Sequence, residues 1–403
     1  MRVLVLTNLY PNPYEPNRAT FNRQQIGALN EEHPVRVISP IPWVTELASV
    51  LRQKPRFSGG RREVCDGIPV EHPRYYYTPK MLRSKYGYFF ERSVKLSFHR
   101  AVRDFSPDIV FAPWAYPDGW AAVKLGRQAG LPVVIKVHGC DLLWGLERHP
   151  GRKKRTIEAL RSADGIVAVS QDLASRVVSS GVDTDRVHVI YDGIDTALFH
   201  PGPMCEARTR LGLGINEPIV LYIGNLVPVK SVSTLIAACA LLDQRGLSFR
   251  CVLIGEGPLW TQLQRQVSRA GLNDRVQLLG ARPHDQLADW YRACNLFVLP
   301  SLSEGVPVVL LEAIATGTPF VASRVGGITE IAGKGCGKLV CPGNVKQLAQ
   351  AVAEQLEASS RQPKALAAEL WPRSHDDAAA ELAQVFKGIL QHASSRTHSV
   401  FSS

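Results

Sequence analysis

Two glutamates eight positions apart, Glu304 and Glu312, lie on either side of a Gly-Val-Pro turn in the run LFVLPSLSEGVPVVLLEAIATGTPFVAS. The apolar residues 296–300 predict a buried strand, and residues 306–315 predict a helix with Pro307 in its first turn. Glu304 is therefore expected just before the helix start and Glu312 two turns along the helix, on nearly the same face, because eight residues at about 3.6 per turn return close to the starting direction. The free N–H groups of the helix start, which bind phosphate, are expected between them. Taken singly, Glu304 is explained as a charge that complements the helix dipole, and Glu312 as a solvated residue of the helix. The pair favours a ligand site, because Glu312 lies among apolar residues and needs a polar partner if buried.

The length and composition of the chain limit its class. It has 403 residues, of which 45% are hydrophobic and 21% are charged, and this length predicts two globular domains. No run approaches the roughly 20 apolar residues that span a bilayer, and the start MRVLVLTNLYP predicts a first strand rather than a signal peptide. The eight cysteines form no Cys-x-x-Cys pair and are expected to be small buried thiols in a reducing compartment. A cytoplasmic protein is therefore predicted.

Most of the net charge of +11 is concentrated in residues 51–103, which hold 13 Lys and Arg against 4 Asp and Glu. Apolar and aromatic residues are interleaved with them, namely Tyr75, Tyr76, Tyr77, Met81, Leu82, Tyr86, Tyr88, Phe89 and Phe90. This pattern is typical of nucleic-acid binding, of a membrane surface, or of an ordinary amphipathic helix with a basic solvated face. No zinc spacing, RNP-type or helix-turn-helix pattern is present, so no nucleic acid is expected. The sharper hypothesis is peripheral contact of 51–103 with the anionic inner face of the cell membrane, where each basic residue contributes roughly 1 kcal/mol.

Apolar strand candidates alternate with helical patterns in two successive series. The first runs from VLVLTNL to VHVIYDGI, the second from PIVLYIGNL to PFVASRV, and the Pro- and Gly-rich residues 199–218 separate them. Such βαβα order predicts an α/β protein with two doubly wound domains, each a parallel sheet covered by helices, facing a central cleft. The predicted domains are 1–200 and 201–375, with 376–403 as a C-terminal helix returning to the first domain.

Polar residues follow many of the predicted strands at the edge where ligands bind in such folds. They are His138 to Asp141, Ser170, Asp192 to Asp195, Gly224 and Asn225 with Lys230, Gly255 to Gly257, and Glu304. Any one of these groups is weak support, since strand ends are normally polar and a lone His is more often structural. Together they predict a shared site.

Three other patterns do not predict a cofactor. Asp183 and Asp185 form an Asp-x-Asp pair, but they lie in a short helix-to-strand turn whose composition explains them. Gly255-x-Gly257 lacks the third Gly of a dinucleotide fingerprint, and the GKGCGK run from Gly333 fails the Walker spacing. No metal and no cofactor are expected.

The motifs of the chain together resemble the retaining, nucleotide-sugar-dependent glycosyltransferases of the GT-B fold, in group 1 and family 4. SEGVPVVLLEAIATGTPFVAS from Ser303 matches the Glu-x7-Glu motif of that family, and the resemblance extends over HGCDL, VSQDL, YDGIDTALFHP, YIGNLVPVKSV and IGEGP. It covers nearly the whole chain. YPNPYEPNRATFNRQQIGAL and WAYPDGWAA look most like bacterial surface-polysaccharide enzymes of the teichuronic-acid type. The resemblance implies two Rossmann-like domains, the N-terminal one binding acceptor and the C-terminal one binding nucleotide sugar.

The same resemblance implies roles for the donor-side residues. Glu312 would accept hydrogen bonds from the ribose hydroxyls, and Glu304 from hydroxyls of the transferred sugar. Lys230 would contact the diphosphate, and Gly224 would let the backbone approach it. Backbone N–H groups near the helix start complete this expected anion site, which includes Gly305, Val306 and Leu310.

His138 would hydrogen-bond the donor sugar near its anomeric carbon, through its carbonyl or its ring. Asn225 stands where many members have Arg, so one usual cation is missing. Arg18 is predicted either to supply that charge, to bind an acidic or phosphorylated acceptor, or to be a solvated loop residue. Asp141 is placed with Arg18 on the acceptor side. Retention without an evident protein nucleophile implies front-face attack, with the departing phosphate taking the acceptor's proton.

The predicted function is therefore transfer of a sugar from a UDP- or GDP-sugar to a saccharide or lipid-linked saccharide acceptor, in cell-surface polysaccharide or glycolipid biosynthesis. A nucleotide-sugar epimerase, a phosphorylase using pyridoxal phosphate on a Lys, and a non-catalytic sugar-nucleotide-binding protein are the alternatives. The base, the sugar, the acceptor and the linkage depend on side chains near 278–282 and on first-domain loops.

Overall fold

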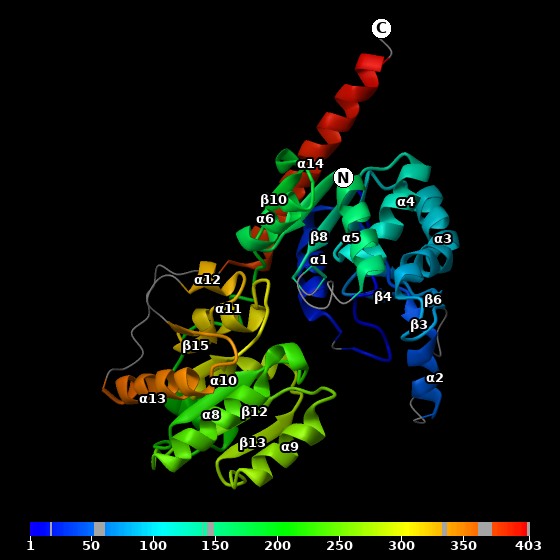
Figure 1. The fold of residues 1–403 in the computed structure, drawn as a ribbon. Coiled ribbons are helices and arrows are strands. Elements are labelled where there is room, and N and C mark those ends of the chain that lie inside the picture. Colours follow the sequence, from blue (N-terminus) through cyan, green and yellow to red (C-terminus); the bar gives the residue numbers. More distant parts are fainter. Residues whose placement is uncertain are drawn as a thin grey trace. The chain divides into compact units, whose positions relative to one another are not determined.

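The structure is a computed structural model that describes residues 1–16, 18–51, 61–139, 141–142, 149–332, 337–361 and 373–400. The chain divides into two compact units (Figure 1). The first contains Met1–Asp192 and His375–Ser403, and the second contains Gly193–Ser374. The predicted division at residue 200 is therefore displaced, because residues 193–200 pack within the second unit.

The first unit is built on a sheet whose described strands run in the order β10-β9-β8-β7-β1-β2-β5-β4. The strands are β1 (Val3–Leu6), β2 (Val35–Ile38), β4 (Arg62–Cys65), β5 (Ile68–Glu71), β7 (Ile109–Ala112), β8 (Val133–Val137), β9 (Gly165–Ala168) and β10 (Val187–Val189). All neighbours pair in parallel except β4 and β5, which form an antiparallel hairpin at the edge. The central strands are apolar on both faces, as expected where helices cover a parallel sheet on both sides.

Helices of the first unit flank this sheet and supply much of its core. They are α1 (Thr20–Glu32), α2 (Trp43–Leu51), α3 (Tyr86–Phe105), α4 (Trp120–Ala129), α5 (Pro150–Ser162), α6 (Gln171–Ser179) and α14 (His375–Val400), and β3 (Ile41–Pro42) pairs with β6 (Arg74–Tyr75). In α3 the buried residues Phe90, Val94, Phe98 and Ala101 recur at helical spacing, so the basic residues between them fall on the outer face. The described part of the basic stretch is thus a hairpin followed by an amphipathic helix.

The last helix, α14, packs in the core of the first unit, although it follows the whole second unit in the sequence (red in Figure 1). Ala378, Leu382 and Phe386 are buried in the same cluster as Val3 and Val5 of the first strand. The Phe386 and Phe111 rings lie 5.4 Å apart. The two ends of the chain therefore stabilise one domain together.

The second unit repeats the architecture with an all-parallel sheet in the order β13-β12-β11-β14-β15-β16. Its strands are β11 (Ile219–Ile223), β12 (Arg250–Ile254), β13 (Val276–Gly280), β14 (Leu296–Leu299), β15 (Phe320–Ser323) and β16 (Gly337–Val340). Its helices are α7 (Met204–Leu211), α8 (Val232–Gln244), α9 (Trp260–Arg269), α10 (Leu287–Ala293), α11 (Val308–Ala315), α12 (Ile328–Ile331) and α13 (Val345–Arg361). The chain order crosses over at β11 and β14, which places the loops after these strands side by side.

The expectation that the cysteines are buried is confirmed for only some of them. Cys239, Cys251 and Cys294 are buried, whereas Cys65 is half-buried and Cys205 and Cys341 are exposed. Cys140 and Cys336 lie outside the described residues. Among the helices that the structure describes, none is both long and apolar enough to cross a membrane.

Replacing Phe386 by Ala should destabilise the first unit by about 3–5 kcal/mol, because it empties an aromatic site in a closed core. The measurement is the free energy of unfolding in urea, followed by circular dichroism. Gln384→Ala on an exposed turn of the same helix is the control, with an expected change within about 0.5 kcal/mol. Equal effects of the two substitutions would contradict the packing of α14 in the core.

Candidate active site

Glu304 lies in the loop that follows β14 and is only 6% exposed. Its Oε1 accepts hydrogen bonds from Lys230 Nζ at 2.6 Å and from Ser301 Oγ at 2.7 Å. Lys230 ends a short 3-10 helix after the neighbouring strand β11. The sheet thus brings together two residues 74 positions apart, and the ammonium balances a carboxylate that would otherwise be costly to bury.

The helix after Glu304 begins later than the sequence predicts. Pro307 is the N-cap and α11 starts at Val308, so Glu304 lies outside the helix and Glu312 lies about one turn into it. Glu304 thus precedes the helix, as predicted, and Glu312 lies about one turn along it rather than two. Leu310 N–H donates to the Pro307 carbonyl at 2.9 Å, which removes the Leu310 amide from the predicted anion site. Gly305 and Val306, both buried, lie in the loop between Glu304 and the N-cap.

Glu312 is held by two side chains that the sequence analysis did not identify. Tyr291 Oη donates to Oε2 at 2.8 Å, and His284 Nε2 lies 2.7 Å from Oε1. Burial lowers the pKa of His284, but the hydrogen bond and the negative charge of Glu312 outweigh it and raise that pKa overall. Burial, with the charge of Glu312, raises the pKa of Tyr291 well above its ordinary value. Both oxygens of Glu312 are therefore oriented by hydrogen bonds, as a ligand-binding carboxylate requires.

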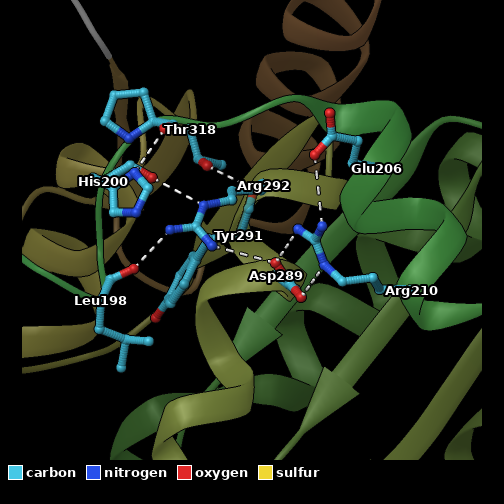
Figure 2. A network of polar contacts seen from close by, with 9 residues as sticks. Leu198, His200, Glu206, Arg210, Asp289, Tyr291, Arg292 and Thr318 are labelled. Carbon is cyan, nitrogen blue, oxygen red and sulfur yellow. Dashed lines mark hydrogen bonds and ion pairs between the residues drawn. The ribbon is translucent and has the colours of Figure 1, made fainter.

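A clamp on α10 keeps Tyr291 in place (Figure 2). The Arg292 guanidinium donates to the carbonyls of Leu198 at 2.7 Å and His200 at 3.0 Å. It also pairs with Asp289, which in turn binds Arg210 of α7. The linker after residue 193 is thereby fixed against α10.

Phe199, within that linker, is buried against the two partners of Glu312. Its ring lies 5.0 Å from the ring of His284 and 5.9 Å from that of Tyr291, both edge-on. The segment 198–200 therefore supports Glu312 indirectly, because Phe199 packs against the two side chains that bind its carboxylate. The sequence signal for this was a single Phe in a linker that contains no Tyr or Trp.

Glycines allow the loops at this end of the second sheet to approach one another. A Cβ on Gly255 would collide with the carbonyl oxygen of Gly224, and one on Gly326 would collide with that of Glu304. Gly224 itself has φ 154°, a conformation that residues with a side chain rarely adopt. Asn225 is exposed, and its carbonyl accepts a hydrogen bond from Tyr222 Oη at 3.1 Å.

In the first unit, His138 follows β8 and its side chain is 9% exposed. Its ring lies 5.0 Å from that of Phe21 and is nearly parallel to that of Trp114 at 6.3 Å. His138 Nε2 is buried and has no hydrogen-bond partner among the described residues. The ring is thus held by aromatic contacts with one nitrogen available.

Asp141 does not have the geometry of an acceptor-binding residue. Its carboxylate is buried and accepts hydrogen bonds from the backbone N–H groups of His138, Gly139 and Ala115. Burial raises the pKa of Asp141, against the opposing effect of these donors and of His138. The structure corrects the expectation, because Asp141 holds the loop that carries His138.

Lys136 and Asp192 form a buried ion pair next to His138. Lys136 of β8 is fully buried, and its Nζ donates to Asp192 Oδ1 at 2.5 Å and to Gln25 Oε1 at 2.6 Å. Asp192 Oδ2 is 3.7 Å from His138 Nδ1. Burial opposes ionisation of Asp192, but Lys136 and His138 more than compensate and hold its pKa below the usual range.

The loop after β1 is anchored by a second buried carboxylate, Asp118. It accepts hydrogen bonds from Thr7 Oγ1 at 3.1 Å, from Asn8 N at 2.7 Å and from Asn8 Nδ2 at 2.5 Å. Burial raises the pKa of Asp118 to about 7 despite these donors. Arg18 donates to Asn8 and pairs with Glu15 at 2.8 Å, so its guanidinium is part of the same loop rather than a solvated loop residue.

The remaining polar residues at strand ends have local structural roles. Ser170 caps α6, since its Oγ accepts from Leu173 N. Asp183 pairs with Arg186 across the turn that the sequence analysis predicted. Within the described ranges, no cluster of three or more His, Cys, Asp or Glu side chains is arranged to hold a metal ion.

Comparison with known sequences identifies the class to which this fold and these strand-end charges belong. The profile described as Glycosyltransferase Family 4 matches residues 19–198, and that described as Glycosyl transferases group 1 matches residues 206–368. The putative teichuronic acid biosynthesis glycosyltransferase TuaC of Bacillus subtilis (strain 168) is 30% identical over 359 residues, which cover 87% of this chain and 88% of TuaC. The chain belongs to the group 1, family 4 glycosyltransferases.

Solved structures show the same GT-B fold over the full length of the chain. Sucrose-phosphate synthase from Thermosynechococcus elongatus superposes with a TM-score of 0.73 at 21% identity, covering 100% of this chain and 99% of that one. Anabaena HepE, solved in complex with UDP-glucose, superposes with a TM-score of 0.68 at 21% identity, covering 99% of each chain. The two Rossmann-like units are therefore the two halves of this fold.

Asp118→Asn is expected to reduce the pH dependence of the free energy of unfolding between about pH 4 and pH 7. The pKa of Asp118 is about 7 in the folded chain and about 4 in an unfolded one, so the folded state keeps a proton that the unfolded state has lost. Stability of the natural chain should then fall as pH rises from about 4 to about 7. Relative to the natural chain, the variant should gain free energy of unfolding across that window, as measured by urea titrations at several pH values.

Asp104→Asn is the matched control. Asp104 is exposed and its hydrogen bond with Arg103 lowers its pKa, so its titration lies below this window. A constant offset between the Asp118 variant and the natural chain from pH 4 to 7 would contradict the raised pKa of Asp118.

Proposed function

We propose that this glycosyltransferase moves a sugar, with retention of configuration, from a nucleoside diphosphate sugar to a saccharide or lipid-linked saccharide. The observation that carries the proposal is the pair of buried carboxylates with distinct partners in the second unit. Glu304 is bound to the cation Lys230, and Glu312 is bound to the neutral donor Tyr291 and to His284. The Lys230–Glu304 pair offers a cation for a phosphate and an acceptor for the hydroxyls of a reacting sugar. The two oriented oxygens of Glu312 match the two hydroxyls of a diol.

On the donor side, Glu312 accepts from the ribose hydroxyls and Glu304 from hydroxyls of the transferred sugar. Lys230 then shifts toward the diphosphate, where a charge-assisted hydrogen bond contributes about 1.5–3 kcal/mol. The N–H groups of Val308 and Val309 precede the first intrahelical hydrogen bonds of α11 and are oriented for an anion. That HepE is solved with UDP-glucose supports a UDP-sugar among the possible donors.

For catalysis, we propose that the departing phosphate accepts the proton of the acceptor hydroxyl, which attacks the face that the phosphate leaves. Lys230 stabilises the negative charge that develops on that phosphate. His138 hydrogen-bonds the transferred sugar, and no protein group forms a covalent bond with it. Detection of a glycosyl-enzyme on Glu304 by mass spectrometry would overturn this mechanism.

The pathway proposal rests on a relative that matches most of the chain. TuaC carries a name that assigns it to teichuronic acid biosynthesis, and it matches 87% of this chain. We therefore propose a role in cell-surface polysaccharide or glycolipid synthesis, at the inner face of the cell membrane.

Surface composition supports the membrane part of this proposal. Among the described residues, the exposed large hydrophobic side chains are concentrated between Leu47 and Leu96, including Met81 at 67% and Leu96 at 78% exposure. Lys80 and Leu82 have positive φ angles at the tip of the loop before α3, and residues 79–85 are all exposed. Exposed Lys80, Arg83 and Lys85 surround this tip, as expected for a surface that binds anionic lipid.

Glu312→Gln should weaken binding of the nucleoside diphosphate about ten-fold or more, because the ribose loses a charged acceptor. Glu304→Gln should leave nucleotide binding closer to normal and lower turnover about 10²–10³-fold, because its partners act on the reacting sugar. Binding is measured by calorimetry with UDP, GDP and ADP, and turnover by transfer or slow hydrolysis of the matching sugar nucleotides.

Glu217→Ala, which breaks a half-exposed ion pair with Arg250 in the same unit, should change neither quantity. Normal transfer by both glutamate variants would show that the site is misplaced. Conversion of the donor without acceptor would identify an epimerase, and binding without transfer or hydrolysis would identify a non-catalytic binding protein.

A triple charge reversal at Lys80, Arg83 and Lys85 should reduce cosedimentation with vesicles containing phosphatidylglycerol, since each lost charge removes roughly 1 kcal/mol of attraction. Met81→Ser should reduce it further and with weaker salt dependence. The control reverses three exposed charges of the second unit, Arg265, Arg269 and Lys346. Absence of binding by the natural chain at low salt would refute the membrane contact.

A further inference from the structure

The buried pair Lys136 and Asp192 is unusual in its surroundings. β8 has the sequence VVIKV, and its lysine is 0% exposed in a strand that is otherwise apolar. A buried ion pair of this kind is weak support for stability, because desolvation offsets the attraction between the charges. Its position therefore calls for a functional explanation, and its nearest titratable neighbour is His138.

The contacts define a chain of three groups. Lys136 Nζ binds Asp192 Oδ1 at 2.5 Å, and Oδ2 of the same carboxylate lies 3.7 Å from His138 Nδ1. Gln25 of α1 accepts a second hydrogen bond from Lys136 at 2.6 Å. His138 Nε2, on the far side of the ring, is buried and has no partner among the described residues.

We propose that Lys136 is a positioning residue that neutralises Asp192, so that this carboxylate orients the His138 ring without charging it and leaves Nε2 as a hydrogen-bond acceptor. An unpaired carboxylate at this distance would favour the imidazolium form. With Lys136 in place, a cation offsets the charge of the carboxylate that lies beside the ring. The inference rests on the proposed contact between His138 and the transferred sugar.

The other groups around the ring are one buried carboxylate and two aromatic side chains. Asp141 lies on the same loop, but it is buried, and its carboxylate is occupied by three backbone N–H groups. From α1 and from the loop after β7, the ring meets the aromatic side chains of Phe21 and Trp114. Removal of Lys136 would therefore leave the Asp192 carboxylate beside His138 without its cation.

An uncharged ring is what the proposed reaction needs. A neutral Nε2 accepts a hydrogen bond from a sugar hydroxyl, whereas an imidazolium can only donate. As the bond to phosphate breaks, positive charge develops on the sugar ring, and a cation beside it would raise the barrier. Lys136 thus acts through Asp192 on His138 without touching the substrate.

The test is the titration of the His138 ring in the full-length chain, followed by NMR of labelled histidine and assigned by the signal that disappears in His138→Gln. In Lys136→Met, the titration midpoint should move to higher pH by about one unit or more. In Asp192→Asn, the midpoint should move to lower pH, because only the lysine charge remains. The acidic limb of the pH–rate profile should shift in the same directions.

Lys136→Met leaves a buried carboxylate without its cation and is the variant most at risk of unfolding. Asp192→Asn combined with Lys136→Met removes both charges, and its midpoint should lie between those of the single variants. Lys124→Met is the control, since Lys124 also pairs with a buried carboxylate, Glu91 of α3, and should leave the midpoint unchanged. Midpoints that stay fixed, or that move the same way in both single variants, would overturn the inference.

The titration midpoints test the role of Lys136, whereas the transfer rate of His138→Gln tests the proposed function, so the two can fail independently. If His138→Gln abolishes transfer but the midpoints do not respond to Lys136, the sugar contact is supported and the positioning role of Lys136 is overturned. If the midpoints respond as expected and His138→Gln transfers at the normal rate, the positioning role stands and the sugar contact is refuted.

Discussion

The need to supply buried carboxylates with cations or hydrogen-bond donors is the constraint on which both units depend. A carboxylate removed from water requires a cation or several hydrogen-bond donors within reach, or it takes up a proton. Glu304 is held by Lys230, Glu312 by His284 and Tyr291, and Asp192 by Lys136. Each carboxylate and its partner come from different parts of the chain, so these sites exist only when the sheets have formed.

In the second unit, this requirement extends beyond the residues that would touch a ligand. Tyr291 can donate to Glu312 only while α10 is fixed, and Arg292 fixes it by binding carbonyls of the linker. Phe199, in that linker, packs against Tyr291 and His284. The linker therefore helps to position the residues that hold Glu312, in addition to connecting the two units.

In the first unit, the loops rather than the strands carry the site. Asp118 and Asp141 each use their carboxylates to hold backbone N–H groups, one in the loop after β1 and one in the loop after β8. Helix α14 supports the same sheet from the C-terminal end of the chain. The basic and apolar surface on α3 and the loop before it lies outside this core, which leaves it available for the proposed lipid contact.

The sequence by itself determined the α/β class, the two series of strands and the glutamate motif, because periodicity and strand-end polarity are local properties of the chain. It also singled out Lys230, Glu304, Glu312 and His138. Tertiary structure decided their partners, since Lys230 meets Glu304 only through adjacent strands and Lys136 meets Asp192 across 56 positions. It also showed that α11 begins only at Val308, that Asp141 holds a loop and that His284 and Tyr291 orient Glu312. Local patterns do not encode these contacts, because each depends on which strands become neighbours and on which charges must be balanced once water is excluded.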